Sequence, residues 1–161
     1  MSSATEVYRL GPDDWQAFRD VRLAALQEAP HAFGSTYEGE VGGSESNWRQ
    51  RIAEWARFVA DVDGQVVGVV GAGFGEFGGS AALTSLWVDP RFRGRGVGTA
   101  LIQAVEEWAR GKDLTQVLLW VTEANSSAEH LYAHLGFMRT GRVSEVRPGE
   151  PALEHEMSKR I

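Results

Sequence analysis

The fold can be read from one stretch, residues 83–99: Leu83-Thr-Ser-Leu-Trp-Val-Asp-Pro-Arg-Phe-Arg-Gly-Arg-Gly-Val-Gly-Thr99. An apolar run is followed by an Asp-Pro turn, three glycines and then the apolar periodicity of a helix that begins near Val97. The pattern predicts a strand, a glycine-rich turn and a helix. The first N–H groups of a helix lack partners within it and lie at the positive end of its dipole. The stretch therefore predicts a site for a phosphate or pyrophosphate group.

The residue types in this turn support that prediction. The glycines carry no Cβ that would keep a phosphate away from the backbone, and Arg93 and Arg95 add positive charge that can neutralise it. A P-loop would need a lysine after Gly98, and the dinucleotide fingerprint Gly-x-Gly-x-x-Gly would need its third glycine where Thr99 stands. The pattern that does match is Arg/Gln-x-x-Gly-x-Gly/Ala.

A second motif lies downstream of the turn. Residues 125–137 read Asn125-Ser-Ser-Ala-Glu-His-Leu-Tyr-Ala-His-Leu-Gly-Phe137. Together with Arg93-Gly-Arg-Gly-Val-Gly98, this segment resembles the two motifs of the GCN5-related N-acetyltransferases (GNAT), which transfer an acyl group from acyl-CoA to an amine. The resemblance covers residues from about 81 to 137, and the flanks fit in length and strand pattern only.

The resemblance implies an α/β (α+β) fold of the GNAT type. It has a mixed, mostly antiparallel sheet of about seven strands, a splayed parallel pair formed by the fourth and fifth strands, and about four flanking helices. Asp63-Gly64 between two apolar runs predicts a hairpin. Strands are expected at 6–10, 57–62, 65–71, up to 88, 117–121, 137–146 and 152–158. Helices are expected at 12–29, 44–55, 97–110 and 125–135, with a loop at 31–43. Periodic apolar positions place Trp15, Trp108 and Trp120 in the core.

The cosubstrate that the resemblance implies is acetyl-CoA. Its pantetheine arm is expected between the splayed strands, paired with the strand backbone at 86–88 as a neighbouring strand would be. Its pyrophosphate is expected on the N–H groups of 94–99, and Asn125 is expected to help position it. The residues expected to bind it are Leu86, Trp87, Val88, Arg93, Gly94, Arg95, Gly96, Val97, Gly98, Thr99 and Asn125.

Acyl transfer from a thioester to an amine needs a proton donor for the leaving thiolate. The resemblance puts Tyr132 in this role, and an ordinary tyrosine pKa of ~10 keeps the hydroxyl protonated at neutral pH. The alternative is that Tyr132 only packs its helix against the core.

The amine must also lose a proton, and the sequence offers no decisive base. Some protein-alanine acetyltransferases of this family carry a glutamate on the fifth strand, at a position that falls on about Trp120 here. Glu123, just after that strand, is the preferred candidate. The other candidates are Glu38, Glu40, Glu154 and Glu156, and each of the five taken singly is expected to be a solvated surface acid. Ser85 could instead orient a water.

The acceptor is expected to be a primary amine of a small molecule or peptide. Its binding is assigned to the loop 31–43 and the hairpin 137–151, with Phe33 and Tyr37 as walls; alternatively, these two rings only pin the loop to the core. His130 and His134 stand four residues apart, but no third ligand is evident, so no metal site is expected.

Composition narrows the class of protein. With 161 residues, the chain is expected to form a single acyltransferase domain over 1–161. It has no cysteine, so transfer should be direct, without an acyl-cysteine. A net charge of −6 argues against nucleic acid and mildly favours a cationic amine, although it also simply aids solubility. A polar N-terminus and the lack of a long apolar run predict a cytoplasmic protein that does not bind a membrane. Homodimers are common in the resembled family, and the sequence leaves the oligomeric state open.

A second function remains compatible with the sequence. A domain that binds CoA or acyl-CoA as a sensor or interaction module, without turnover, would also need the glycine turn to hold the pyrophosphate. The missing fifth-strand glutamate motivates this alternative, and Tyr132 argues against it. A nucleotide-binding domain unrelated to CoA is a weaker third possibility.

Overall fold

The computed structural model describes residues 4–161 and contains one sheet of seven strands. The strands are β1 (Thr5–Arg9), β2 (Ala56–Val62), β3 (Gln65–Phe74), β4 (Ser80–Val88), β5 (Gln116–Thr122), β6 (Met138–Glu145) and β7 (Leu153–Arg160). They lie in the order β1-β2-β3-β4-β5-β7-β6. β4 and β5 are parallel, and the other neighbours are antiparallel. The expected fold class, with its splayed parallel pair, is confirmed.

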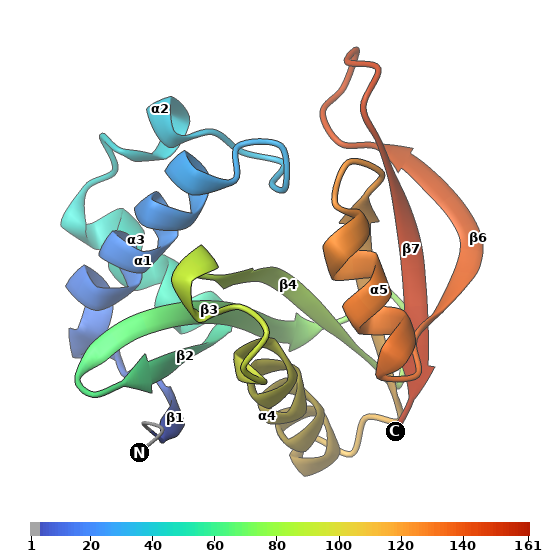
Figure 1. The fold of residues 1–161 in the computed structure, drawn as a ribbon, viewed down its shortest axis with the longest axis horizontal. Coiled ribbons are helices and arrows are strands. Elements are labelled where there is room, and N and C mark those ends of the chain that lie inside the picture. The colour runs from blue at the N-terminus through green and yellow to red at the C-terminus, as the bar shows by residue number, and fades with distance from the viewer. Residues whose placement is uncertain (1–3) are drawn as a thin grey trace.

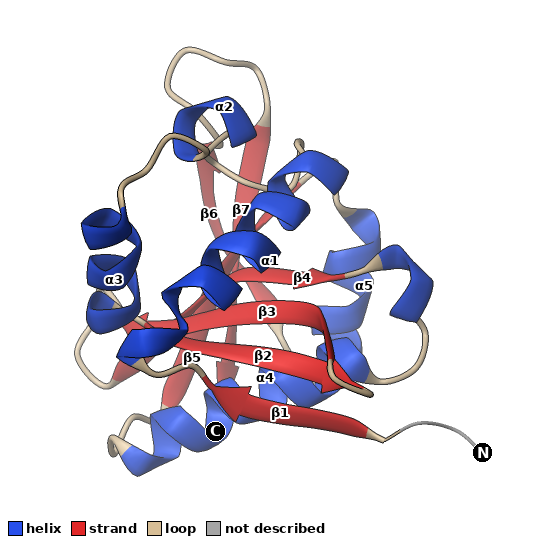
Figure 2. Cartoon of the chain, turned by 90° about the vertical axis from the view of Figure 1, so that its left-hand side faces the viewer, coloured by secondary structure: helices blue, strands red, loops and turns tan. Residues whose placement is uncertain are grey.

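Helices cover both faces of the sheet. They are α1 (Trp15–Glu28), α2 (Tyr37–Glu40), α3 (Glu45–Glu54), α4 (Val97–Gly111) and α5 (Ser126–His134), with 3-10 turns at Pro12–Asp14 and Pro90–Phe92. α1 and α3 lie over one face of β2 and β3, and α4 lies on the opposite face (Figures 1 and 2). α5 packs beside β5 in the other half of the molecule (Figure 1). Among residues 4–161, no helix is long and apolar enough to cross a bilayer.

The two faces of the sheet bury two separate apolar cores because neighbouring strand residues point to opposite sides. Val59 and Val69 belong to the core under α1 and α3, which is centred on Trp48. Ala60 and Val70, the next residue in each strand, belong to the core under α4. Packing on both faces of the sheet therefore fixes the positions of the strand ends that form the site.

Several expected elements are confirmed, and two expectations are wrong. Val62 pairs with Gln65 around the Asp63-Gly64 turn, as the hairpin prediction requires. The expected loop at 31–43 contains the short helix α2, because the Thr36 side chain accepts a hydrogen bond from the Gly39 N–H and caps it. Trp120 is not in the core but 37% exposed, because its strand turns this side chain toward the cavity described below.

The feature that positions the site is the separation of β4 from β5. The two strands pair only from Ser80 to Ala82, and beyond this point their facing edges are free of each other. A bulge also interrupts β4, because Ser85 and Leu86 both lie opposite Val70 of β3, and Ser85 has a φ of 56°. Backbone strain of this kind concentrates at functional sites. The separated strands and the bulge together open the centre of the sheet.

Candidate active site

Two adjoining cavities of about 540 Å³ each open where β4 and β5 part. The glycine-turn cavity is lined by residues 28–32, by 86–88 of β4, by the turn around Gly96 and by the start of α5. The inter-strand cavity is lined by residues 32–35, by 82–86 of β4, by 118–122 of β5 and by side chains of β7. Four residues line both: Ala32, Leu86, Asn125 and Ala128. Two ligands bound in these cavities would therefore meet at the parting of the strands.

The glycine turn has the geometry of an anion site. Gly94 and Gly96 have φ values of 76° and 83°, and a Cβ added at either would meet nothing within 4 Å. Gly96 caps α4 with no side chain over it, so the first N–H groups of that helix face the cavity without a protein acceptor on the cap. At Gly98 a Cβ would lie 2.9 Å from Leu131 Cδ2, so this glycine lets α4 approach α5.

The two arginines of the turn are less available than expected. Arg93 donates from Nε to the carbonyl oxygen of Val88 at 2.9 Å and pairs through Nη2 with Glu28. Arg95 does not line the cavity; its guanidinium lies 5.3 Å from the centre of the Phe92 ring. The other ten residues expected to bind the cofactor all line the glycine-turn cavity.

Asn125 has a structural task that the sequence did not reveal. Its Oδ1 accepts a hydrogen bond from the Ala128 N–H at 3.2 Å and caps α5. The residue also lines both cavities. Its side chain therefore fixes the start of α5 at the point where the cavities meet.

Tyr132 lies on the wall of the inter-strand cavity, one helical turn after Ala128. The side chain is buried, and its ring packs edge-on against Phe137, with ring centres 5.8 Å apart. Burial raises the pKa of the Tyr132 hydroxyl above its ordinary value. A tyrosine in this state holds its proton firmly at neutral pH.

The structure separates the candidate bases. Glu123 lines neither cavity, and its side chain is 53% exposed and lies 2.8 Å from His155 Nε2. Glu154 and Glu156 both line the inter-strand cavity. Glu156 is buried, accepts from Thr140 Oγ1 at 2.7 Å and pairs with Arg142 at 2.9 Å. The Glu154 carboxylate has no hydrogen bond or ion pair within residues 4–161, and partial burial raises its pKa.

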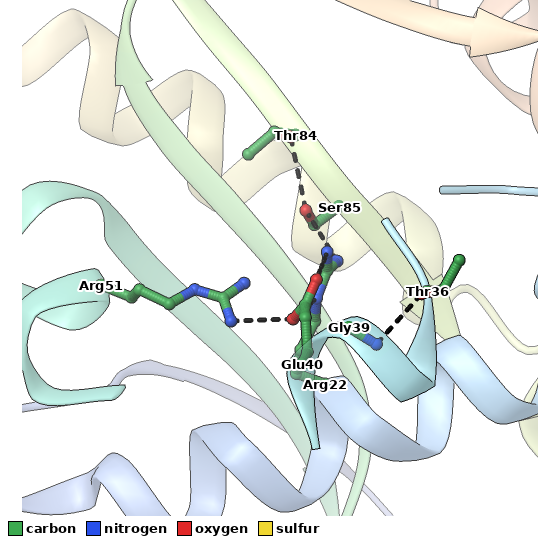
Figure 3. Close-up of polar contacts among 7 residues, drawn as sticks. All are labelled: Arg22, Thr36, Gly39, Glu40, Arg51, Thr84 and Ser85. Atoms are coloured by element: carbon green, nitrogen blue, oxygen red, sulfur yellow. Dashed lines mark hydrogen bonds and ion pairs between the residues drawn. The ribbon is translucent and has the colours of Figure 1, made fainter. Parts of the chain in front are cut away.

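Glu40 is the centre of a partly buried ionic network (Figure 3). Its carboxylate accepts from Arg22 Nε and Nη2 at 3.0 and 2.9 Å and from Arg51 Nη1 at 2.8 Å. Arg22 Nη1 donates to Ser85 Oγ at 3.2 Å, which links α1 to the bulge of β4. Burial alone would raise the pKa of Glu40, but the hydrogen bonds from Arg22, Ser35 and Arg51 and the charge of Arg22 lower it to about 2. The expectation of solvated surface acids is therefore wrong for Glu40 and for Glu156.

This network predicts an acid-sensitive stability. Replacement Glu40→Gln should lower the free energy of unfolding by about 3 kcal/mol at pH 7, because it leaves the buried Arg22 and the partly buried Arg51 without their carboxylate. The folded-state pKa is depressed, so the contribution of Glu40 is complete above its ordinary value of 4.5 and is lost as pH falls toward about 2. Urea unfolding at pH 7, 4 and 3 measures the gap in free energy of unfolding between wild type and variant. A gap that stays constant over this range would contradict the assignment.

Of the remaining residues expected at the site, one lines the inter-strand cavity and the others do not. Phe33 lines the inter-strand cavity, and the Arg22 guanidinium lies 5.0 Å from its ring centre. Tyr37 lines neither cavity and packs on the core under α1 and α3. His130 and His134 are exposed, and no group of three potential metal ligands occurs in the described part of the chain.

The wall residues that the sequence did not reveal include Arg22, Trp120 and Thr122. The Thr122 hydroxyl is buried without a hydrogen-bond partner among the described residues and lies across from Glu154 in the β5–β7 register. A signal existed for Arg22, because it stands within the apolar stripe of α1 between Val21 and Ala25. A charged residue at a core position of a helix is a sign of a paired or functional group.

Comparisons with known proteins agree with this geometry. A family model described as "Acetyltransferase (GNAT) family" matches residues 15–137. An uncharacterized N-acetyltransferase of Methanocaldococcus jannaschii is 38% identical over 95 residues, which cover 56% of this chain and 42% of that protein. N-acetylaspartate synthetase of Danio rerio is 38% identical over 88 residues, which cover 55% of this chain and 31% of that protein. The matched region therefore spans less than half the length of both relatives.

Solved structures share the fold over nearly the whole chain. A GNAT-family acetyltransferase of Streptococcus pneumoniae superposes with a TM-score of 0.80 at 19% identity, over 98% of this chain and 99% of that one. The PaiA N-acetyltransferase of Thermoplasma acidophilum, solved in complex with coenzyme A, gives a TM-score of 0.76 at 17% identity over 98% and 99%. At these identities the likeness shows a common architecture.

Proposed function

The chain belongs to the acetyltransferase (GNAT) family, and we propose that it transfers an acetyl group from acetyl-CoA directly to a primary amine of a small molecule or peptide. One observation carries the proposal. The glycine-turn cavity and the inter-strand cavity meet at Leu86, Asn125 and Ala128, where β4 and β5 part. A cofactor that enters from one side and an amine that enters from the other would meet there.

The chain's residues fit acetyl-CoA. The facing edge of β4 after Ala82 has no strand partner in β5, so its backbone groups are free to pair with the pantetheine amides. The open N-terminus of α4 at Gly96 suits the pyrophosphate. Bound acetyl-CoA would supply the acetyl group as a thioester.

Tyr132 is the proposed proton donor. The residue lies on the wall of the inter-strand cavity one turn from Ala128, which both cavities share. Because burial raises its pKa, the hydroxyl is protonated over the whole neutral range. It would donate this proton to the sulfur that leaves when the acetyl group is transferred.

Glu154 is the better supported base, although the sequence favoured Glu123. Glu154 lines the cavity that would hold the amine, and Glu123 does not. Since no cation pairs with Glu154 within residues 4–161 and its pKa is raised, its carboxylate is free to accept a proton from the incoming ammonium.

A pair of variants separates the two acids. Replacement Glu154→Gln should lower kcat/KM at pH 7 by about 10²-fold, the lower end of the range for a lost general base. The base works deprotonated, so kcat/KM of the wild type should rise with pH through an enzyme pKa above the ordinary carboxyl value of 4.5, and this limb should vanish in the variant. Replacement Glu123→Gln is the control and should leave the profile unchanged. The reverse result would return the role to Glu123.

Acceptor-dependent release of CoA thiol tests the function itself. The purified protein is mixed with acetyl-CoA and an amine panel of amino acids, peptides, polyamines and aminoglycosides, and the N-acetylated product is identified by mass. We expect release with at least one acceptor. Binding of acetyl-CoA without release for any acceptor would instead support a sensor or interaction module.

Domain extent, cellular location and oligomeric state are further parts of this proposal. We propose a single acyltransferase domain over residues 1–161, of which 1–3 lie outside the described part. The cytoplasmic location and the homodimer stay predictions. Cell fractionation and light scattering of the purified protein test them.

A further inference from the structure

Arg57 of β2 is a buried charge without a counter-ion among the described residues. Only 7% of the residue is exposed, its Nε is buried without an acceptor, and its side chain forms no hydrogen bond or ion pair within residues 4–161. Its guanidinium lies 4.8 Å from the ring centre of Phe18 and 6.0 Å from that of Trp55. Burial, followed by the charges of Arg51 and Arg22, lowers its pKa to about 10, so it stays charged at neutral pH. A buried charge without a counter-ion is costly, which suggests that a ligand supplies one.

The guanidinium lies directly behind the wall of the inter-strand cavity. A Cβ added to Gly71 would sit 2.8 Å from both Arg57 Nη1 and Thr84 Cγ2, so only glycine at this position lets the arginine extend across β3 to β4. Thr84 and Trp55, the two residues beside it, both line the cavity.

Arg57 is part of a cationic side of this cavity. Arg22 lines the cavity itself, and both Arg22 and Arg51 contact the carboxylate of Glu40. The negative charges of Glu40 and Glu54 offset only part of the positive field that Arg51 and Arg22 exert on Arg57. Arg22 donates one hydrogen bond from each of Nε, Nη1 and Nη2. Two of its five N–H groups therefore remain for another acceptor.

The opposite side of the cavity is acidic. It carries Glu154 and Glu156 on β7 together with Glu76, and Arg142 pairs with the last two. Glu154 stays unpaired there within residues 4–161. The cavity thus presents Arg22, with Arg57 behind the wall, on one side and the unpaired carboxylate of Glu154 on the other, which suits a ligand with charges of both signs.

We propose that the acceptor is an amine that also bears a carboxylate, such as an amino acid or an acidic peptide end. Its carboxylate would bind Arg22 in the field of Arg57, and its ammonium would face Glu154. The inference rests on the proposed acetyl transfer, and it narrows the acceptor class.

Matched acceptors test the inference in the wild-type protein. Glycine and glycinamide, alanine and alaninamide, and leucine and leucinamide form pairs in which only the acid bears a carboxylate, and spermidine carries none. We expect kcat/KM for thiol release to be about 10- to 100-fold higher for the acid of at least one pair, the size of a lost hydrogen bond to a charged group. Amides or spermidine that react as well as the acids would overturn the inference and leave the acetyltransferase intact. No release with any acceptor would instead remove the proposed function.

Replacement Arg57→Met tests whether Arg57 contributes to recognition of the acceptor's carboxylate. The ratio of kcat/KM between acid and amide should fall about tenfold or more, mainly through KM for the acid. The melting temperature should stay level or rise, because the variant removes a buried charge that has no hydrogen bond or ion pair within residues 4–161. Arg49→Met on the exposed face of α3 is the matched control and should keep the ratio. An unchanged ratio in Arg57→Met, or a marked drop in melting temperature with both acceptors slowed equally, would show a purely structural arginine.

Discussion

Replacement of Tyr132 by phenylalanine is expected to lower kcat by about 10²- to 10⁴-fold, the usual contribution of a general acid. The change removes only the hydroxyl of a residue on the wall of the inter-strand cavity, and this hydroxyl forms no hydrogen bond to another side chain within residues 4–161. The edge-on packing against Phe137 is kept. The dissociation constant of acetyl-CoA and the melting temperature should therefore stay close to those of the wild type.

Steady-state thiol release and calorimetric binding measure the two effects separately. Tyr8→Phe is the matched control, because Tyr8 is 42% exposed on β1 and lines neither cavity. A loss of kcat in Tyr132→Phe with wild-type affinity supports the proton donor. Equal turnover in both variants would leave Tyr132 as a packing residue of α5.

Replacement of Gly96 by alanine is expected to weaken acetyl-CoA binding by about 10- to 100-fold, which corresponds to losing one or more hydrogen bonds to a charged group. Gly96 has a φ of 83° at the N-terminus of α4, a conformation that costs alanine about 1–2 kcal/mol. Relief of this strain would turn the first N–H groups of the helix away from the cavity, and the new Cβ would stand where a phosphate approaches.

The β2–β3 hairpin provides a control with the same backbone strain. Gly64 also has a φ of 83° and nothing within 4 Å of an added Cβ, but it lies in a turn outside both cavities. Gly64→Ala should therefore lose a similar amount of stability and keep its affinity for acetyl-CoA. If both variants bind acetyl-CoA equally well, the turn at Gly96 is not the phosphate site.

The parts of the site that could be predicted are local in sequence. The glycine turn and the positions of Asn125 and Tyr132 each depend on a few consecutive residues, and local backbone geometry follows from such residues. Even here the side chains of Arg93 and Arg95 depart from expectation, because Glu28 and Phe92 contact them.

The residues that could not be predicted depend on register between distant segments. Glu154 faces the cavity because it pairs with Thr122 across β5 and β7, and a shift of one residue would turn it away. Glu40 and Arg22 are 18 residues apart and meet only after α1 and α2 pack together. Arg57 reaches the cavity wall through the space left at Gly71, a relation between two strands that composition does not reveal.

Calorimetric titration of the purified protein with acetyl-CoA, and separately with ATP, tests the central claim most directly. The account predicts one acetyl-CoA site with a dissociation constant that is micromolar or tighter, corresponding to about −8 kcal/mol, and no heat with ATP. No binding of acetyl-CoA, or equal binding of ATP, would contradict an acyl-CoA site between β4 and β5.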